Sequence, residues 1–276
     1  MMRRFWCYLV VVLLTALVQS PAHAQESPRP PEVSFPSGKL LLRGFVYKPA
    51  GDGPFPAVLW NHGSERLPGW LPQLGPLFVS KGYVLFIPHR RGQGLSSGAG
   101  EYIMDALAKA QEQSGPAARS RQLVELMQVH LEDQEAALAY LKSLPYVDAK
   151  RVAVAGCSFG GIQTLLAAAE DLGLRAAVDF AGGAESWRGS PDLRDRMIRA
   201  ARGARVPVFF IQAKNDYDTS PSEQLAKEME KTGKPHQIHI FPPSGKTTQE
   251  AHEFCIRGGE VWGAEVFEFL ASAMAH

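Results

Sequence analysis

The segment Gly156-Cys157-Ser158-Phe159-Gly160-Gly161 places a serine between two glycines. The apolar run Val152–Ala155 lies directly before it, and an apolar stretch containing Leu165 and Leu166 follows. A serine flanked by glycines between a strand and a helix is typical of a nucleophile elbow, which exposes the hydroxyl at the carboxyl end of a sheet. Ser158 is therefore the predicted nucleophile, and the helix N-terminus beside it favours negative charge.

A serine hydroxyl needs a histidine to take its proton and a carboxylate to orient that histidine. In this architecture the acid follows a later strand, and the histidine lies in a loop near the end of the chain. Asp216, shortly after the apolar run Val208–Gln212, is the predicted acid. Asp218 is the alternative, although its position before Thr219-Ser220-Pro221 also suits a cap for the next helix.

His252 is the predicted base, because it alone lies in a predicted loop between the last strand and the final helix, Gly259–Ala273. Three other histidines follow Asp216: His236 lies at the start of a predicted strand, His239 lies inside it, and His276 ends the chain. His62 precedes Ser158, which is the wrong order for the base in this architecture.

Acyl transfer also builds negative charge on the carbonyl oxygen, and backbone N–H groups must already point at that oxygen. Phe159, the residue after the nucleophile, is the first predicted donor. The second is expected from the loop after the early strand, Asn61-His62-Gly63-Ser64. We assign this role to the Ser64 amide, with the Gly63 amide as the alternative.

The elements that must position these residues follow from the apolar pattern. Short apolar runs alternate with helix-length amphipathic stretches, which predicts an α/β fold: one domain with a mostly parallel sheet and helices on both faces. Leucines and Met127 between Leu123 and Leu141 recur at three- and four-residue steps and predict a long helix. Leu40–Tyr47 alternates loosely, as an antiparallel strand does. The predicted buried strands are Ala57–Trp60, Tyr83–Ile87, Val152–Ala155, Ala176–Phe180, Val208–Gln212 and Gln237–Phe241.

The chain divides into three parts before any finer assignment. Residues 1–24 resemble a signal peptide, because Arg3 and Arg4 precede a short apolar run and Ala22-His23-Ala24 suits cleavage after Ala24. An uncleaved anchor is the alternative, but a span needs roughly 20 apolar residues. Residues 25–38 form a proline-rich lead-in outside the core, and 39–276 the folded domain. Within it, Tyr102–Arg121 fits no strand and is interpreted as a small lid or insertion.

The net charge limits which partners are expected, and the cysteines bear on the compartment in which the protein folds. The chain has a net charge of +1 and no basic run after the signal peptide, so neither nucleic acid nor an anionic membrane surface is an expected partner. No membrane anchor is expected after cleavage, and the protein should be periplasmic or secreted. Cys157 and Cys255 would then meet an oxidising compartment, and we hypothesise that they form a disulfide. The oligomeric state stays open.

Together these residues resemble the α/β-hydrolase superfamily, and within it the dienelactone hydrolase-like esterases. The resemblance covers about Leu40 to Leu270 and also includes the loop Arg90-Arg91-Gly92-Gln93-Gly94-Leu95-Ser96, whose R-G-x-G-x-S pattern is structural in the family. Dienelactone hydrolases proper use a cysteine nucleophile, whereas Ser158 holds that position here. Cys157 could replace it only if the elbow shifted by one residue, and the symmetric glycines disfavour this.

The resemblance implies a hydrolase without a cofactor or metal that cleaves small-molecule carboxylic esters through an acyl-enzyme. The first alternative is an exported peptidase or amidase with the same triad. The second is an α/β-hydrolase scaffold that binds ligands without catalysis, although such scaffolds usually lack a triad residue.

Overall fold

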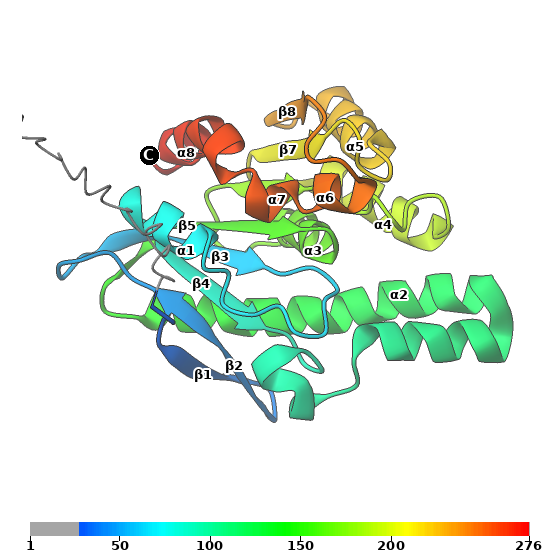
Figure 1. Cartoon of the computed structure of the whole chain (residues 1–276), viewed down its shortest axis with the longest axis horizontal. Coiled ribbons are helices and arrows are strands. Elements are labelled where there is room, and N and C mark those ends of the chain that lie inside the picture. The colour runs from blue at the N-terminus through cyan, green and yellow to red at the C-terminus, as the bar shows by residue number, and fades with distance from the viewer. Residues whose placement is uncertain (1–27, 276) are drawn as a thin grey trace, which may run out of the picture.

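A computed structural model describes residues 28–275, and it consists of an eight-stranded sheet covered by helices on both faces (Figure 1). The strand order is β1-β2-β4-β3-β5-β6-β7-β8. Pairs β1/β2 and β2/β4 are antiparallel, and all pairs from β4/β3 to β7/β8 are parallel. The predicted α/β class and its mostly parallel sheet are therefore confirmed, while the predicted signal peptide, 1–24, lies outside the described residues.

Every strand predicted from the apolar runs is present, with ends that differ by a few residues. The strands are β1 (Glu32–Ser37), β2 (Leu40–Tyr47), β3 (Phe55–Asn61), β4 (Val84–His89), β5 (Val147–Cys157), β6 (Ala177–Phe180), β7 (Val208–Ala213) and β8 (His236–Phe241). The helices are α1 (Leu74–Ser80), the 3₁₀ helix η1 (Gly94–Ala99), α2 (Ile103–Ser143), α3 (Phe159–Ala169), α4 (Pro191–Gly203), α5 (Ser220–Lys231), α6 (Thr248–His252), α7 (Phe254–Arg257) and α8 (Gly259–Met274).

The lead-in prediction was wrong for its second half. Residues 32–37 form strand β1, which pairs with β2 at the edge of the sheet. Phe35 is only 1% exposed and packs against Phe86 and Tyr140, so this strand belongs to the core. The prolines misled the prediction, because an edge strand tolerates Pro36 where an interior strand would not.

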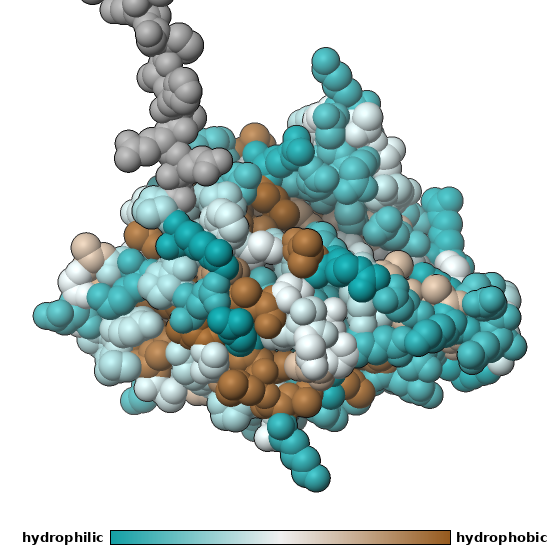
Figure 2. All heavy atoms as spheres, turned by 60° about the horizontal axis from the view of Figure 1, so that its bottom comes forward, coloured by the Kyte–Doolittle hydropathy of each residue, from teal (hydrophilic) through white to brown (hydrophobic). Residues whose placement is uncertain are grey.

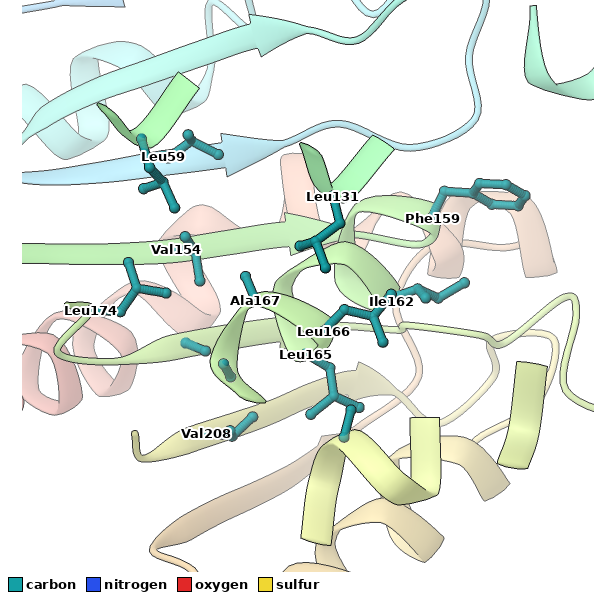
Figure 3. Close-up of a cluster of buried hydrophobic side chains, with 14 of the residues drawn as sticks. Leu59, Leu131, Val154, Phe159, Ile162, Leu165, Leu166, Ala167, Leu174 and Val208 are labelled. Atoms are coloured by element: carbon teal, nitrogen blue, oxygen red, sulfur yellow. The ribbon is translucent and has the colours of Figure 1, made fainter. Parts of the chain in front are cut away.

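The two faces of the sheet carry separate hydrophobic clusters. Helices α2, α3, α4 and α5 contribute to the first, and α1, α7 and α8 to the second. Alternate residues of β3 divide between them: Leu59 joins the first cluster and Trp60 the second. Figure 3 shows part of the first, with side chains from β3, β5, β7 and α2 gathered around α3. The helix that follows Ser158 is thus held rigidly by buried contacts.

The segment 102–121, interpreted as a lid or insertion, forms the first arm and the turn of a helical hairpin. Gly115, at φ 75°, and Pro116 break α2, and the chain reverses there so that its first part runs alongside the second (Figure 1). In Figure 2 the hairpin, at the right-hand end, presents mainly hydrophilic residues. The predicted long helix is its second arm. Among residues 28–275, no helix combines the length and the apolar character that a bilayer span requires.

The R-G-x-G-x-S loop has the structural role that the resemblance implied. A Cβ at Gly92 would overlap the carbonyl of Glu101, and one at Gly94 would overlap the ring of His89. Both glycines also have positive φ, which side chains rarely tolerate.

This loop is tied to α2 and the sheet edge through Arg91 and Ser96. Arg91 Nε donates to the buried Asp133 carboxylate at 2.8 Å, and Ser37 Oγ donates to the same carboxylate at 2.7 Å. Ser96 Oγ accepts the amide of Arg43 at 2.9 Å. The loop therefore fixes β1, β2 and α2 relative to one another.

The hypothesised disulfide is present. Cys157, at the end of β5, is bonded to Cys255 of α7, and the two cysteines are 98 residues apart in the sequence. Both sulfur atoms lie near the carbonyl oxygen of His252, at 3.8 and 3.7 Å. The bond thus fastens the short helices that carry His252 to the strand that carries the elbow.

Reduction of this disulfide should destabilise the fold strongly. In the chain-entropy view, a cross-link closing a loop of 98 residues contributes about 4.7 kcal/mol to the free energy of unfolding. Urea denaturation of the oxidised and the reduced wild type measures the difference without changing any side chain. Cys157→Ala/Cys255→Ala is the control, whose stability should not respond to reductant. An unfolding free energy equal in the oxidised and reduced wild type would contradict the prediction.

Candidate active site

Ser158 lies on a sharp turn between β5 and α3. Its backbone has φ 57° and ψ −115°, a region that residues with a side chain seldom adopt. Gly160 must be glycine, because a Cβ there would overlap the carbonyl oxygen of Asn61, and a Cβ at Gly156 would overlap the carbonyl of Gly160. The amide of Ser158 is fixed by a 2.9 Å bond to the carbonyl of Phe180 on β6. The sequence motif therefore forms the predicted elbow.

Asp216 and His252 form a buried pair. His252 Nδ1 lies 2.8 Å from Asp216 Oδ1, and the Asp216 side chain is 1% exposed. Asp216 also accepts the amide of Tyr217 at 2.6 Å and the side-chain amide of Gln212 at 3.0 Å. These contacts orient the carboxylate toward the imidazole, as a catalytic acid requires.

Asp218, the alternative acid, is engaged elsewhere. Arg188 Nε donates to it at 2.8 Å, and the amide and hydroxyl of Ser220 donate to it at 3.0 and 2.6 Å. Burial alone would raise its pKa, but the hydrogen bonds from Ser220 and Arg188 outweigh burial and hold the pKa below its usual value. Asp218 thus stabilises the start of α5, and Asp216 is the carboxylate that contacts His252.

His252 ends the short helix α6, where a loop was predicted. The helix begins with a capping box, in which Thr247 Oγ1 accepts the Glu250 amide at 3.1 Å and the Glu250 carboxylate accepts the Thr247 amide at 3.0 Å. A capping box stabilises even a single helical turn. The remaining ring nitrogen, Nε2, is buried and has no hydrogen-bond partner among the described residues.

Ser158 and His252 line one cavity of about 420 Å³, a size suited to a small-molecule ligand. No direct hydrogen bond joins Ser158 Oγ to His252 Nε2 in the described chain, but catalytic hydrogen bonds are often long without substrate and tighten when it binds. Tyr102 and Met104 also line the cavity, so the start of the α2 hairpin contributes to the cavity wall.

Gly63 and Ser64, the alternative oxyanion donors, both line the cavity. Buried Arg90 donates to the carbonyls of His62 and Gly63, and Tyr102 Oη donates to the carbonyl of Ser64 at 2.6 Å. These bonds fix the orientation of the peptide groups in the loop. Phe159 begins α3, and its side chain packs in the first core cluster rather than lining the cavity.

His62 is a structural residue, as its position in the chain order suggested. It is buried, its Nε2 accepts the amide of Arg90 at 3.3 Å, and burial together with the nearby Arg90 charge holds its pKa well below the ordinary value. His62 is therefore neutral at physiological pH and is fixed against the Arg90 guanidinium.

Among residues 28–275, no three His, Cys, Asp or Glu side chains gather as metal ligands.

The cavity also contains three carboxylates that the motif analysis did not identify: Glu65, Glu185 and Glu253. Glu185 follows β6, and its Oε2 lies 3.7 Å from His252 Nε2. Glu185 belongs to no sequence motif, because its importance arises only when the loop after β6 folds over His252.

A profile of the family described as "Dienelactone hydrolase family" matches residues 43–259. The chain belongs to the dienelactone hydrolase family. This member is 30% identical over 152 residues to the quorum-quenching protein AidA of Acinetobacter baumannii, which covers 54% of this chain and 42% of that protein. The chain spans about half the length of the curated relatives it matches.

Solved structures share the α/β-hydrolase fold of this dienelactone hydrolase family member. An acylaminoacyl peptidase of Pyrococcus horikoshii matches with a TM-score of 0.64 and 18% identity, over 88% of this chain and 40% of the peptidase. A Klebsiella pneumoniae protein assigned as a dienelactone hydrolase matches with a TM-score of 0.62 and 20% identity, over 86% of this chain and 97% of that one.

The pH dependence of catalysis by this family member should follow His252. Burial lowers the pKa of His252, but the bonded Asp216 and the charges of Glu185 and Glu65 raise it more, so the pKa lies above its ordinary value of 6.5. Only the neutral imidazole can accept a proton from Ser158. Activity should therefore be lost as pH falls through a midpoint above 6.5.

The test is a pH profile of kcat/KM with a neutral ester. Glu185→Gln should move the acidic limb to lower pH, whereas Glu112→Gln, which removes an exposed charge on the α2 hairpin, should not. A limb at or below the ordinary histidine pKa in the wild type would contradict this assignment.

Proposed function

We propose that this chain is a serine hydrolase that cleaves carboxylic esters through an acyl-enzyme on Ser158. The observation that carries the proposal is the Asp216–His252 pair, because His252 lines the same cavity as Ser158 and its Nε2 has no hydrogen-bond partner among the described residues. Family membership supports hydrolysis, and the elbow supports serine as the nucleophile. The whole protein's substrate is part of this proposal, because the curated relatives extend well beyond the matched region.

The proposed mechanism has two halves. His252 Nε2 removes the proton from Ser158 Oγ, and that oxygen attacks the ester carbonyl carbon. The amides of Phe159 and Ser64 stabilise the resulting oxyanion, and His252 then gives its proton to the departing alcohol oxygen. Water, deprotonated by His252, next attacks the acyl-serine. His252 returns this proton to Ser158 Oγ as the bond between that oxygen and the acyl carbon breaks, and the carboxylic acid is released. Asp216 holds the imidazole tautomer and stabilises its protonated form throughout.

The second candidate is a peptidase or amidase that uses the same residues. The structural likeness to an acylaminoacyl peptidase favours it, although identity of 18% establishes the fold alone. In the described residues the cavity is lined by the hydrolase domain alone. Amide hydrolysis would also require protonation of a poorer leaving group. We therefore favour esters.

We also propose that the protein is exported to the periplasm or secreted. The supporting observations are the signal-like residues 1–24 and the disulfide between Cys157 and Cys255, since such bonds persist in oxidising compartments. Mass spectrometry of protein recovered from the periplasm and the medium would locate the mature chain. An N-terminus at Gln25 supports the proposed cleavage, and retention of Met1 in a membrane fraction would instead indicate an anchor.

The activity is tested by comparing p-nitrophenyl acetate, butyrate and octanoate with aminoacyl p-nitroanilides. Hydrolysis of the esters, together with labelling of Ser158 by a neutral fluorophosphonate, supports the proposal, and the chain-length trend measures the acyl site. Faster turnover of the anilides would favour the peptidase. A chain that neither hydrolyses nor is labelled would be the binding scaffold.

A further inference from the structure

We infer that the site selects substrates whose leaving group carries a positive charge, and that Glu185 is the residue that recognises it. The inference rests on the proposed function, because it assigns a substrate class to the same Ser158 site. It rests independently on the arrangement of charged side chains around the cavity.

The position of Glu185 identifies which half of the substrate it meets. His252 Nε2 must contact the leaving oxygen in order to protonate it. Glu185 Oε2 lies 3.7 Å from this same nitrogen. A group attached to the leaving oxygen is therefore placed beside the Glu185 carboxylate, whereas the acyl group extends from the other side of the carbonyl carbon.

Three arginines that lie within three residues of a cavity-lining residue in the sequence all have acidic partners. Arg66 Nη2 donates to both oxygens of Asp105, at 2.8 and 2.9 Å. Arg188 is paired with Asp218 at 2.8 Å, and Arg257 with Glu253 at 2.6 Å. These partners are Asp105, Asp218 and Glu253, and none of the three arginines is available to neutralise Glu185.

Glu185 itself has no lysine or arginine partner in the described chain, where its ion contact is with His252. Its side chain is 45% exposed, so a ligand can reach it. No lysine or arginine of the described residues lines the cavity. The wall therefore holds a net negative charge that a cationic ligand would balance.

Glu65 is the second carboxylate, and we expect it to contribute less. It follows the oxyanion loop and lines the same cavity. Arg90 lies behind this loop, bonded to the carbonyls of His62 and Gly63, and its charge interacts with Glu65. The positive charge of Arg90 thus partly offsets the negative charge of Glu65, whereas no lysine or arginine among residues 28–275 does the same for Glu185.

Aromatic recognition of the cation is less suitable here. Tyr102 lines the cavity, but the guanidinium of Arg66 lies over its ring, 4.0 Å from the centroid. A ring face already covered by a cation cannot bind another one well. The carboxylate of Glu185 is therefore the group that provides charge selection.

The experiment compares acetylthiocholine with its uncharged isostere, 3,3-dimethylbutyl thioacetate, in which carbon replaces the ammonium nitrogen. The ratio of their kcat/KM values cancels changes in the chemical step common to both. We expect the wild type to favour the cation by roughly threefold to tenfold, as a partly exposed carboxylate allows. The preference should shrink at high salt because of screening.

Variants separate charge recognition from effects on His252. Glu185→Gln should bring the ratio close to one, Glu65→Gln should reduce it less, and Glu112→Gln should leave it unchanged. If Glu185 acted only by tuning His252, its substitution would change both rates equally and preserve the ratio. A wild-type ratio of one or lower, with both thioesters hydrolysed, would overturn the inference but leave the esterase proposal intact.

A second measurement applies if neither thioester is turned over. Choline and 3,3-dimethylbutan-1-ol are compared as protectants of Ser158 against a neutral fluorophosphonate. Protection by choline alone, lost in Glu185→Gln, supports the inference, and equal protection by both alcohols overturns it. Absence of labelling at Ser158 would instead contradict the proposed function, and the inference would fall with it.

Discussion

Ser158→Ala should lower kcat for ester hydrolysis by about a millionfold, since removing the nucleophile of a serine triad in subtilisin has an effect of that order. Alanine at this position removes the attacking oxygen and nothing else that the fold uses, because the backbone amide rather than the hydroxyl bonds to Phe180. The measurement is steady-state hydrolysis of p-nitrophenyl butyrate, with circular dichroism to show that the variant is folded.

Cys157→Ser provides the matched control for the neighbouring residue. It breaks the disulfide but leaves Ser158 in place, so it should reduce stability far more than it reduces kcat at low temperature. Residual activity of Ser158→Ala near the wild-type value would show that another residue is the nucleophile. Cys157 would not be that residue, because its sulfur is bonded to Cys255.

Asp216→Asn should lower kcat by about four orders of magnitude, the loss expected when the carboxylate behind a catalytic histidine becomes an amide. The amide would favour the wrong tautomer of His252, because its nitrogen donates where the carboxylate accepts the Nδ1 proton. Geometry and volume stay almost unchanged, so the effect should appear in kcat with little change in stability.

Asp218→Asn is the control for this substitution, two residues away in the same loop. It weakens the bonds from Arg188 and Ser220 and should reduce stability, but it should change kcat by less than about tenfold because Asp218 does not touch His252. The reverse result, with the large loss of activity at Asp218, would show that the acid was assigned incorrectly. Parallel urea denaturation of both variants separates the two effects.

The fold could be predicted from the sequence to the extent that the strands are buried on both faces. Such strands read as continuous apolar runs, as in β4, β7 and the second half of β5. Strand β1 does not, because it lies at the edge, alternates between exposed and buried residues and contains Pro36. Its place in the sheet depends on pairing with β2 and on Phe35, which a local pattern cannot show.

The site could be predicted where chain order and strand ends constrain it. Ser158 and Asp216 each follow a parallel strand, so the sheet must bring them to the same edge. His252 was assigned by order alone, and its placement on α6 depends on a capping box that was not recognised in advance. The structure brings Asp216 and His252 into contact, while the catalytic role of each residue remains a proposal.

Glu185 could not have been identified in this way. It stands three residues after Gly182, in a turn whose shape depends on the buried Asp179 accepting the Gly182 amide at 2.8 Å. Neither residue belongs to a motif, and their effect on the cavity depends on how β6 and α6 meet across the sheet edge. Substrate selection therefore rests on the least predictable part of the chain.

The disulfide has a mechanical consequence. Ser158, Asp216 and His252 all lie between Cys157 and Cys255, so the bond encloses the whole triad in one covalent ring. A force applied to the two ends of the chain passes through the sulfur atoms and bypasses this ring. The 98 residues between the cysteines could extend by roughly 350 Å when pulled, but only after the bond is reduced. The segment from Cys157 to Cys255 is thereby protected from tension that unfolds the rest of the chain.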